Sequence, residues 1–330
     1  MEERRAPMFA DKQDYSFSTC WNIRRHSFGA DMIDEIRGLG FRRVELNYNV
    51  TDDLLRTIEP MIERGDIAVS SVHNTFPHLD DPDYGTDSVL LGFEDGPRRD
   101  RSIELLVRSA EHAHRYGASA VVVHPGEVPI EEELDRELKT LWRQHGPDSA
   151  AYQSRWSELL ERREAAAPAY LARIGDSLEA ACEQIARRGY RVRLGLETRS
   201  RCYQIPTLRE ARLLCDRLAG APVGLWYDIG HGMMMGHMGL YDPVGEALAM
   251  KNDIVGVHIH ETVGLADHWC PYVHSGDPDG FDVFLPLIAA APVRVYELKA
   301  ACAPDEIERS HRLIASRIAA LGLDKGGLEQ

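Results

Sequence analysis

Eight short apolar or β-branched runs alternate along the chain with longer segments of helical periodicity, and this alternation limits the folds open to the sequence. The runs occupy residues 15–20, 42–48, 67–73, 119–124, 192–198, 223–228, 254–260 and 293–298. Helix-like stretches, several of them closed by glycine, cover residues 30–40, 102–117, 172–189 and 207–220. Strict alternation of strand and helix predicts parallel strands joined by right-handed crossovers.

Eight such units favour a closed (β/α)₈ barrel, the TIM-barrel fold of the α/β class, over an open doubly wound sheet. The open sheet requires a glycine-rich phosphate-binding turn after its first strand, and residues 18–29, STCWNIRRHSFG, contain no G-x-G-x-x-G. The chain has 330 residues, of which 44% are hydrophobic, and this is enough to fill one large barrel. We therefore predict a single domain over residues 1–330, with the barrel at about 15–320.

Two segments are longer than a minimal barrel connection. Residues 79–100 are polar and follow the third run, and residues 128–168 form a highly charged, helix-like insertion after the fourth. Both follow the carboxyl ends of predicted strands, the face on which barrel enzymes build their active sites and lids.

The net charge and the spacing of the cysteines limit which partners and which cellular compartment we expect for the protein. The formal net charge of −15 repels nucleic-acid phosphates and anionic membranes. The six cysteines form no C-x-x-C pair, so neither a zinc ribbon nor a disulfide framework is predicted. The amino-terminal residues lack the apolar core of a signal peptide, and no stretch has the apolar length of a transmembrane helix. We expect a cytoplasmic protein without a nucleic-acid or membrane partner.

Ionisable residues recur at the carboxyl ends of the predicted strands. They are Glu45, His73, His124, Glu197, Asp228 with His231, His258 with His260, and Glu297. In a parallel barrel these ends converge on one mouth, where clustered carboxylates would repel one another without a cation. The set Glu197, Asp228, His258 and Glu297 is therefore predicted to bind a divalent metal. A site of carboxylates and imidazoles without cysteine suits Mn²⁺, Zn²⁺, Co²⁺ or Fe²⁺.

Seven short motifs follow one another along nearly the whole chain: GFRRVELNYN, SSVHNTF, VVVHPGE, LGLETRS, YDIGHG, VHIHET and VYELK. In order and spacing they resemble the xylose-isomerase-like TIM-barrel superfamily. That superfamily includes sugar and sugar-phosphate isomerases and epimerases, inosose dehydratases, and endonuclease IV of AP endonuclease family 2. Each motif is weak alone, and the ordered set is specific to the superfamily without identifying one member.

The resemblance implies the same four metal ligands, with His258 preferred to His260 because it lies three residues before Glu261. His231 resembles a histidine that contacts substrate or supports the metal site in the epimerases. Extra zinc positions of endonuclease IV are matched by His73, His124, His231 and His268. With His260, these residues are candidates for a second metal or for substrate contact. The endonuclease pattern has an Asp two residues before its last histidine, where this chain has Ala266 and Asp267 is out of step.

The function implied is that of a divalent-metal-dependent isomerase or epimerase. Its substrate would be a small sugar, a sugar phosphate or a polyol ketone, with proton transfer through a metal-stabilised enediolate. Glu197 and Glu297 would act as general base and acid, with His231 as a further catalytic candidate. The candidate substrate-binding residues are Glu45, Arg199, Lys299 and Trp21. For Glu45 a structural role is equally consistent with the sequence.

Two other reaction classes use the same barrel. One is an endonuclease IV-like, metal-dependent phosphodiesterase, in which clustered metals activate water. Its disadvantages here are the net charge and the acidic loops after the third and fourth strands. The other class is a lyase, dehydratase or metal-dependent oxidase, which the predicted ligands leave open. The family includes dimers and tetramers, so the resemblance also allows a homo-oligomer.

Overall fold

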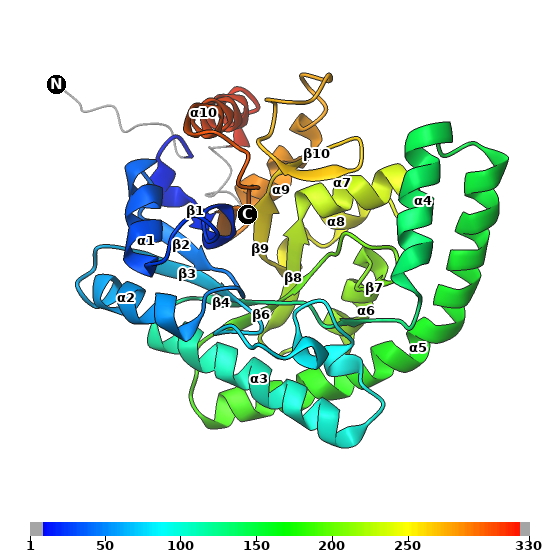
Figure 1. Ribbon diagram of the computed structural model, residues 1–330, viewed down its shortest axis with the longest axis horizontal. Coiled ribbons are helices and arrows are strands. Elements are labelled where there is room, and N and C mark those ends of the chain that lie inside the picture. Colours follow the sequence, from blue (N-terminus) through cyan, green and yellow to red (C-terminus); the bar gives the residue numbers. More distant parts are fainter. Residues whose placement is uncertain (1–8, 324–330) are drawn as a thin grey trace.

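The computed structural model describes residues 9–323, and at its centre eight parallel strands form a closed barrel (Figure 1). Residues 1–8 and 324–330, the two ends of the predicted domain, lie outside the described part. Around the barrel the strands follow in the order β1 (Ser16–Ser18), β12 (Val293–Tyr296), β9 (Ile254–Ile259), β8 (Val223–Asp228), β6 (Arg193–Glu197), β4 (Ala120–Val123), β3 (Ala68–His73) and β2 (Arg43–Leu46). Parallel pairing of β1 with both β12 and β2 closes the ring. The predicted (β/α)₈ barrel is confirmed, with its strands at the predicted places.

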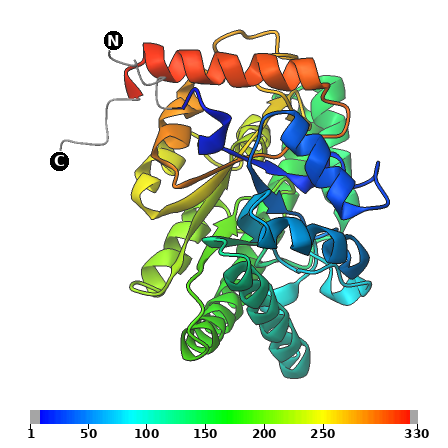
Figure 2. The same cartoon turned by 90° about the vertical axis from the view of Figure 1, so that its left-hand side faces the viewer.

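Helices enclose the barrel on its outside (Figures 1 and 2). The α-helices are α1 (Gly29–Gly38), α2 (Asp52–Glu63), α3 (Gly96–Arg115), α4 (Glu132–His145), α5 (Ala150–Arg187), α6 (Leu208–Arg217), α7 (Ile229–Met238), α8 (Gly245–Ala249), α9 (Leu285–Ala290) and α10 (Pro304–Ala320). Short 3-10 helices cover Lys12–Asp14, Thr19–Trp21, Pro82–Tyr84, Leu90–Gly92, Lys251–Asp253 and Asp282–Phe284. None of the helices in the described range combines the length and the apolar composition needed to cross a bilayer.

Two short antiparallel pairs lie beyond the carboxyl ends of the barrel strands. One joins β5 (Gly126–Glu127) to β7 (Gln204–Ile205), and the other joins β10 (Glu261–Val263) to β11 (Ala266–Trp269). Because β5 follows β4 and β10 follows β9, both pairs extend the face of the barrel to which the predicted ligands belong.

Local sequence signals account for where the helices begin and which face they bury. At the start of α6, the Thr207 hydroxyl accepts the backbone N–H of Glu210, and the Glu210 carboxylate accepts the backbone N–H of Thr207. In α2 the buried residues recur at helical spacing, as Leu54, Leu55, Ile58 and Met61. Such a stripe gives the helix one apolar face to bury against the barrel.

Helix α5 begins earlier than the sequence periodicity indicates. The helix expected from residue 172 begins at Ala150 and runs unbroken through Pro168. Proline removes one backbone hydrogen bond, but alanines on both sides favour helix, and buried Ala167 and Ile174 hold the flanking turns against the core. The first half of α5 therefore continues directly into the helix beside the barrel, and α4 lies alongside that first half at the edge of the molecule (Figure 1).

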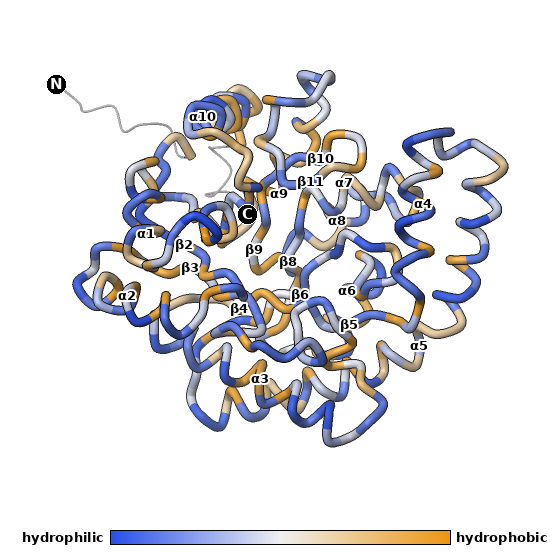
Figure 3. The backbone as a smooth tube through the Cα atoms, in the orientation of Figure 1, coloured by the Kyte–Doolittle hydropathy of each residue, from blue (hydrophilic) through white to orange (hydrophobic). Residues whose placement is uncertain are grey.

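The barrel interior is filled by a compact apolar cluster around Trp226, whose other members are Ala120, Val122, Val255, Val293 and Val295. The indole is fully buried and fits because two nearby positions are glycine. A Cβ at Gly195 would lie 2.9 Å from the ring, and one at Gly256 would lie 2.4 Å from it. Figure 3 shows the matching pattern of hydropathy, with apolar strands inside and hydrophilic residues prominent on the outer helices. The ends of β6, β8 and β9 are thus positioned by one tryptophan and two glycines.

We expect Gly256→Ala to lower the free energy of unfolding by about 1–3 kcal/mol, because the added methyl group would overpack the cluster around Trp226. Chemical denaturation measures the change. Gly38→Ala is the matched control, since a Cβ at that helical position meets no atom within 4 Å. Gly256→Ala with undiminished stability would contradict this account of the interior.

Candidate functional site

Four ionisable side chains converge where four neighbouring strands end. Glu197 and Asp228 are the last residues of β6 and β8, His258 is the next to last residue of β9, and Glu297 directly follows β12. One ligand atom from each lies within 4.8 Å of the others, and none of the four residues is more than 5% exposed. The structure therefore brings together the four residues that the sequence analysis grouped.

The arrangement of atoms in this cluster fits a metal ion. Nδ1 of His258 lies 3.3 Å from Oδ2 of Asp228, 3.2 Å from Oε2 of Glu297 and 3.5 Å from Oε1 of Glu197. Both His258 Nδ1 and Asp228 Oδ2 are buried, and neither has a hydrogen-bond partner among the described residues. Buried polar atoms without a partner carry a free-energy cost that a coordinated cation removes. Three carboxylates and one imidazole form a donor set suited to a divalent transition metal.

Glu45 determines which nitrogen of His258 faces the cluster. Its fully buried carboxylate lies 3.1 Å from Nε2 of His258 and accepts the Ser71 hydroxyl at 2.9 Å. A carboxylate can only accept, so Nε2 carries the proton and the lone pair is on Nδ1. Such carboxylate–histidine pairs orient metal-binding imidazoles. Glu45 is fully buried and does not line the pocket, so its contacts are those of the structural role considered for it.

Asp228 is held from two sides by its own neighbours. Its Oδ1 accepts the backbone N–H of His231 at 2.7 Å, which caps α7, and lies 2.8 Å from Nε2 of His260. His260 is fully buried, and its Nδ1 accepts the backbone N–H of His268 at 3.0 Å. A Cβ at Gly230 would lie 2.0 Å from that ring, so the glycine of the DIGHG motif makes room for it. Nδ1 of His260 is thus occupied within the protein, whereas its buried Nε2 lies close to Asp228 without a hydrogen-bond partner among the described residues.

His231 and His268 present their remaining nitrogens to the pocket. Nδ1 of His231 donates to the Thr198 carbonyl oxygen at 3.1 Å, and Nδ1 of His268 donates to the Glu297 carbonyl oxygen at 2.9 Å. The Asp267 carboxylate, although out of step in the sequence, lies 3.9 Å from Nε2 of His231. With His260, the two histidines also form a group whose ring nitrogens lie within 4.8 Å of one another.

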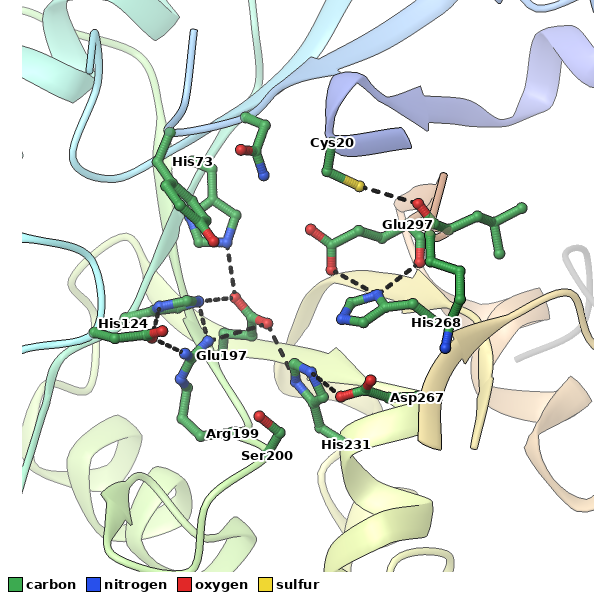
Figure 4. A pocket seen from close by; sticks show the side chains of 15 residues that line it. Cys20, His73, His124, Glu197, Arg199, Ser200, His231, Asp267, His268 and Glu297 are labelled. Atoms are coloured by element: carbon green, nitrogen blue, oxygen red, sulfur yellow. Dashed lines mark hydrogen bonds and ion pairs between the residues drawn. The ribbon is translucent and has the colours of Figure 1, made fainter. Parts of the chain in front are cut away.

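A further group shares Glu197 with the first cluster. Oε2 of Glu197 lies 2.6 Å from Nε2 of His124 and 3.1 Å from Nε2 of His73. The guanidinium of Arg199 contacts His124 Nε2 and the Asp87 carboxylate, and it lies 3.5 Å from Oε1 of Glu197. Figure 4 shows these side chains on one wall of the pocket, opposite Glu297 and His268.

The clusters surround a pocket of about 250 Å³ at the mouth of the barrel. Arg199 and Lys299 line it, whereas Trp21 does not. The Trp21 indole is 1% exposed, donates to the Cys302 carbonyl oxygen at 3.0 Å and packs in the core, so its predicted substrate contact is wrong. Lining residues that the sequence analysis did not single out are Cys20, Asn47, Tyr48, Asp87, Ser200 and Leu298. Asn47 and Tyr48 are the two residues that follow β2, so the two positions past each strand end would have pointed to them.

Burial and neighbouring charges separate the pKa values of the two glutamates at the pocket. Burial raises the pKa of Glu297, and the carboxylates of Glu197 and Glu45 add to this against His258 and His268. Burial also acts to raise the pKa of Glu197, but His124, His231 and His258 hold it well below its usual value. Glu297 is therefore the carboxyl that more readily keeps a proton, and Glu197 the one that more readily stays ionised.

The pKa values of the two pocket histidines, His231 and His268, are also shifted in opposite directions. Burial would lower the pKa of His231, but Asp228 and Glu197 raise it to about 9. Burial, together with the neighbouring His260, lowers the pKa of His268. At neutral pH, His231 can donate a hydrogen bond from Nε2 to a bound ligand, whereas His268 can accept one.

Comparisons with known proteins place the fold. A family model described as xylose isomerase-like TIM barrel matches residues 33–286. A search of curated protein sequences finds no match. The chain is 18% identical to a 3-keto-D-glucoside 4-epimerase from E. coli, with a TM-score of 0.62 over 92% of this chain and 99% of that one. It is 14% identical to a D-tagatose 3-epimerase-like protein, with a TM-score of 0.63 over 93% and 98%. It is also 14% identical to a D-allulose 3-epimerase from Methylomonas sp., with a TM-score of 0.55 over 93% and 96%.

One carboxyl behind the pocket gives a pH-dependent prediction for stability. Burial, with a contribution from Asp87, raises the pKa of Glu127 from 4.5 to about 7. Between these values the folded state binds more protons than the unfolded state, so stability falls as pH rises. We expect the free energy of unfolding of the wild type to fall, relative to Glu127→Gln, by on the order of 2 kcal/mol between pH 4.5 and 8. Denaturation curves across this range measure it, and parallel profiles would contradict it.

Proposed function

Because the chain belongs to the xylose isomerase-like TIM-barrel family, we propose that it is a divalent-metal-dependent enzyme. Its reaction is the isomerisation or epimerisation of a small sugar, sugar phosphate or polyol ketone. The observation that carries the proposal is the convergence of Glu197, Asp228, His258 and Glu297, with partnerless atoms on two of them. The similar structures that are named as epimerases of 3-keto-D-glucoside and D-allulose support this substrate class.

These four residues would hold one Mn²⁺, Zn²⁺, Co²⁺ or Fe²⁺ ion. When bound, the ion polarises a substrate carbonyl and stabilises the negative charge that develops on its oxygen. Glu45 keeps the lone pair of His258 directed at the ion, and the backbone N–H of His231 leaves only Oδ2 of Asp228 free for it. The protein thus fixes the donor atoms before any substrate enters.

Proton transfer is proposed to run between the two glutamates that flank the pocket (Figure 4). Glu197, whose pKa is held low, would remove the proton from the substrate carbon as general base. Glu297, whose pKa is raised, would return a proton at the other carbon or on the opposite face. His231 would donate to a substrate oxygen and His268 would accept from a hydroxyl.

Lys299 is the proposed contact for a substrate hydroxyl or phosphate at the rim. Its Nζ lies 4.1 Å from the centre of the Trp269 ring, so the ammonium is held at the pocket by a cation–π contact. A phosphate would meet the carboxylates of Asp87 and Asp267 in the same pocket, which favours a neutral sugar over a highly charged one.

A metal-dependent phosphodiesterase is the second candidate, and the group of His73, His124 and Glu197 beside the first cluster is the observation that favours it. Hydrolysis of this kind uses two ions about 4 Å apart. The net charge of −15 opposes binding of a nucleic-acid substrate. A lyase, dehydratase or oxidase would use the same residues and would differ in its product.

Glu197→Gln tests the proposal directly. We expect turnover to be abolished and metal occupancy to fall, with the fold intact, because the variant loses both the base and a charged ligand. The assays are solvent-deuterium exchange into a panel of ketoses and inososes, elemental mass spectrometry and circular dichroism. Glu132→Gln, an exposed change on α4, is the matched control. Undiminished turnover of Glu197→Gln would remove this residue from the mechanism.

Glu45→Gln tests the positioning of His258. A neutral amide is a weaker acceptor for the Nε2 proton, so the imidazole becomes a poorer ligand and the affinity for Mn²⁺ or Zn²⁺ should fall about 10–100-fold. Competition with a chromophoric chelator measures the affinity. Ser71→Ala, which removes a hydrogen bond to the same carboxylate and one to the Ser70 hydroxyl but leaves the Glu45 charge, should have a smaller effect. Equal affinities of Glu45→Gln and wild type would contradict the role given to Glu45.

A further inference from the structure

In the group of His73, His124 and Glu197, the Nε2 atoms of two imidazoles face one carboxylate oxygen. Nδ1 of His73 lies 3.2 Å from the Asn74 carbonyl oxygen, and Nδ1 of His124 lies 3.2 Å from the Thr86 carbonyl oxygen. Since carbonyl oxygens only accept, both Nδ1 atoms carry protons, and the Nε2 atoms of His73 and His124 face Oε2 of Glu197 at 3.1 Å and 2.6 Å. Two imidazoles and a carboxylate gathered in one buried place form a donor set that a positively charged group, either a metal ion or a cation of the chain, can fill.

Arg199 supplies that group from within the chain. Its guanidinium is only 6% exposed and contacts Nε2 of His124. The same guanidinium nitrogen lies 3.5 Å from Oε1 of Glu197. Arginine stays charged at any accessible pH, and its N–H groups can donate to an imidazole lone pair and a carboxylate together.

A loop carboxylate holds the guanidinium in this position. The second terminal nitrogen of Arg199 contacts Oδ1 of Asp87, which belongs to the polar segment after β3. Gln204 donates to the same Asp87 oxygen at 3.5 Å, so the carboxylate is itself positioned. Figure 4 shows Arg199 lying against His124 and Glu197 on the pocket wall. A charge-assisted pair of this kind fixes both the place and the orientation of the cation.

We propose that Arg199 is a built-in cation that fills the ligand set of His73, His124 and Glu197 and so limits the barrel to one divalent ion. The inference rests on the proposed metal site formed by Glu197, Asp228, His258 and Glu297. A second ion at His124 Nε2 would lie beside the guanidinium, where two buried positive charges repel strongly. The pocket then does not bind the pair of ions that phosphodiester hydrolysis needs. The proton transfer proposed for it requires only one ion.

The number of ions per chain tests the proposal without any activity assay. The full-length protein is stripped with a chelator and reloaded with excess Mn²⁺ or Zn²⁺, and the bound metal is counted by native and elemental mass spectrometry. We expect one ion in the wild type and two in Arg199→Met, which keeps an unbranched apolar stem but removes the guanidinium and its charge. The added ion should be lost in Arg199→Met/His73→Ala. Arg201→Met, whose guanidinium lies 3.9 Å from Asp87, is the matched control and should bind one ion.

Two results would overturn the inference: two ions in the wild type, or no gain in Arg199→Met. If Arg199→Met does not fold by circular dichroism, Arg199→Gln takes its place, and a dipolar-coupled Mn²⁺ pair in the wild-type electron paramagnetic resonance spectrum overturns the proposal without a variant. A wild type that binds no ion contradicts the proposed function instead. The inference is then still decided by whether loss of the Arg199 charge adds an ion.

Discussion

Carboxylates buried at the mouth of the barrel are the feature on which the rest of the site depends. Glu45, Glu197, Asp228 and Glu297 lie within one water-poor region, and uncompensated charges there would be costly. Histidines offset part of this free-energy cost through the contacts of His258 with Glu45 and of His260 with Asp228. His258 Nδ1 and Asp228 Oδ2, which have no hydrogen-bond partner among the described residues, show where protein groups alone do not offset this cost.

Glycines beside the proposed ligands are part of the same arrangement, because they make room for buried rings. Gly195, Gly230 and Gly256 each lie two residues from a proposed ligand, at Glu197, Asp228 and His258 respectively. Two of these glycines accommodate the Trp226 indole and the third accommodates the His260 ring. Gly195 and Gly256 lie in strands, where side chains two residues apart share one face, so space made there for the Trp226 ring also fixes where Glu197 and His258 point. Core packing and ligand geometry are therefore set by the same few positions.

Sequence patterns predicted what depends on periodicity and strand order. The eight apolar runs were enough to predict the barrel. Their polar ends were enough to predict that Glu197, Asp228, His258 and Glu297 converge, because parallel strands bring their carboxyl ends together. The patterns did not separate the two roles considered for Glu45, since its partner His258 is 213 residues away. They misplaced Trp21, which packs in the core although it follows β1, and they ended an insertion at Pro168 where α5 continues. Asp87 lies in a loop without periodicity, and only tertiary structure brings it to Arg199.

Glu197 connects the two halves of the pocket because each of its oxygens faces a different set of partners. Oε2 meets the imidazoles of His73 and His124, while Oε1 faces His258 and His231. A cation beside His124 draws electron density from the Glu197 carboxylate and so weakens it as a base and as a ligand. An arginine there withdraws less than a divalent ion would, because its single charge is delocalised over three nitrogens and shared with Asp87. The choice of cation beside His124 therefore adjusts the basicity of the carboxylate proposed to remove the proton.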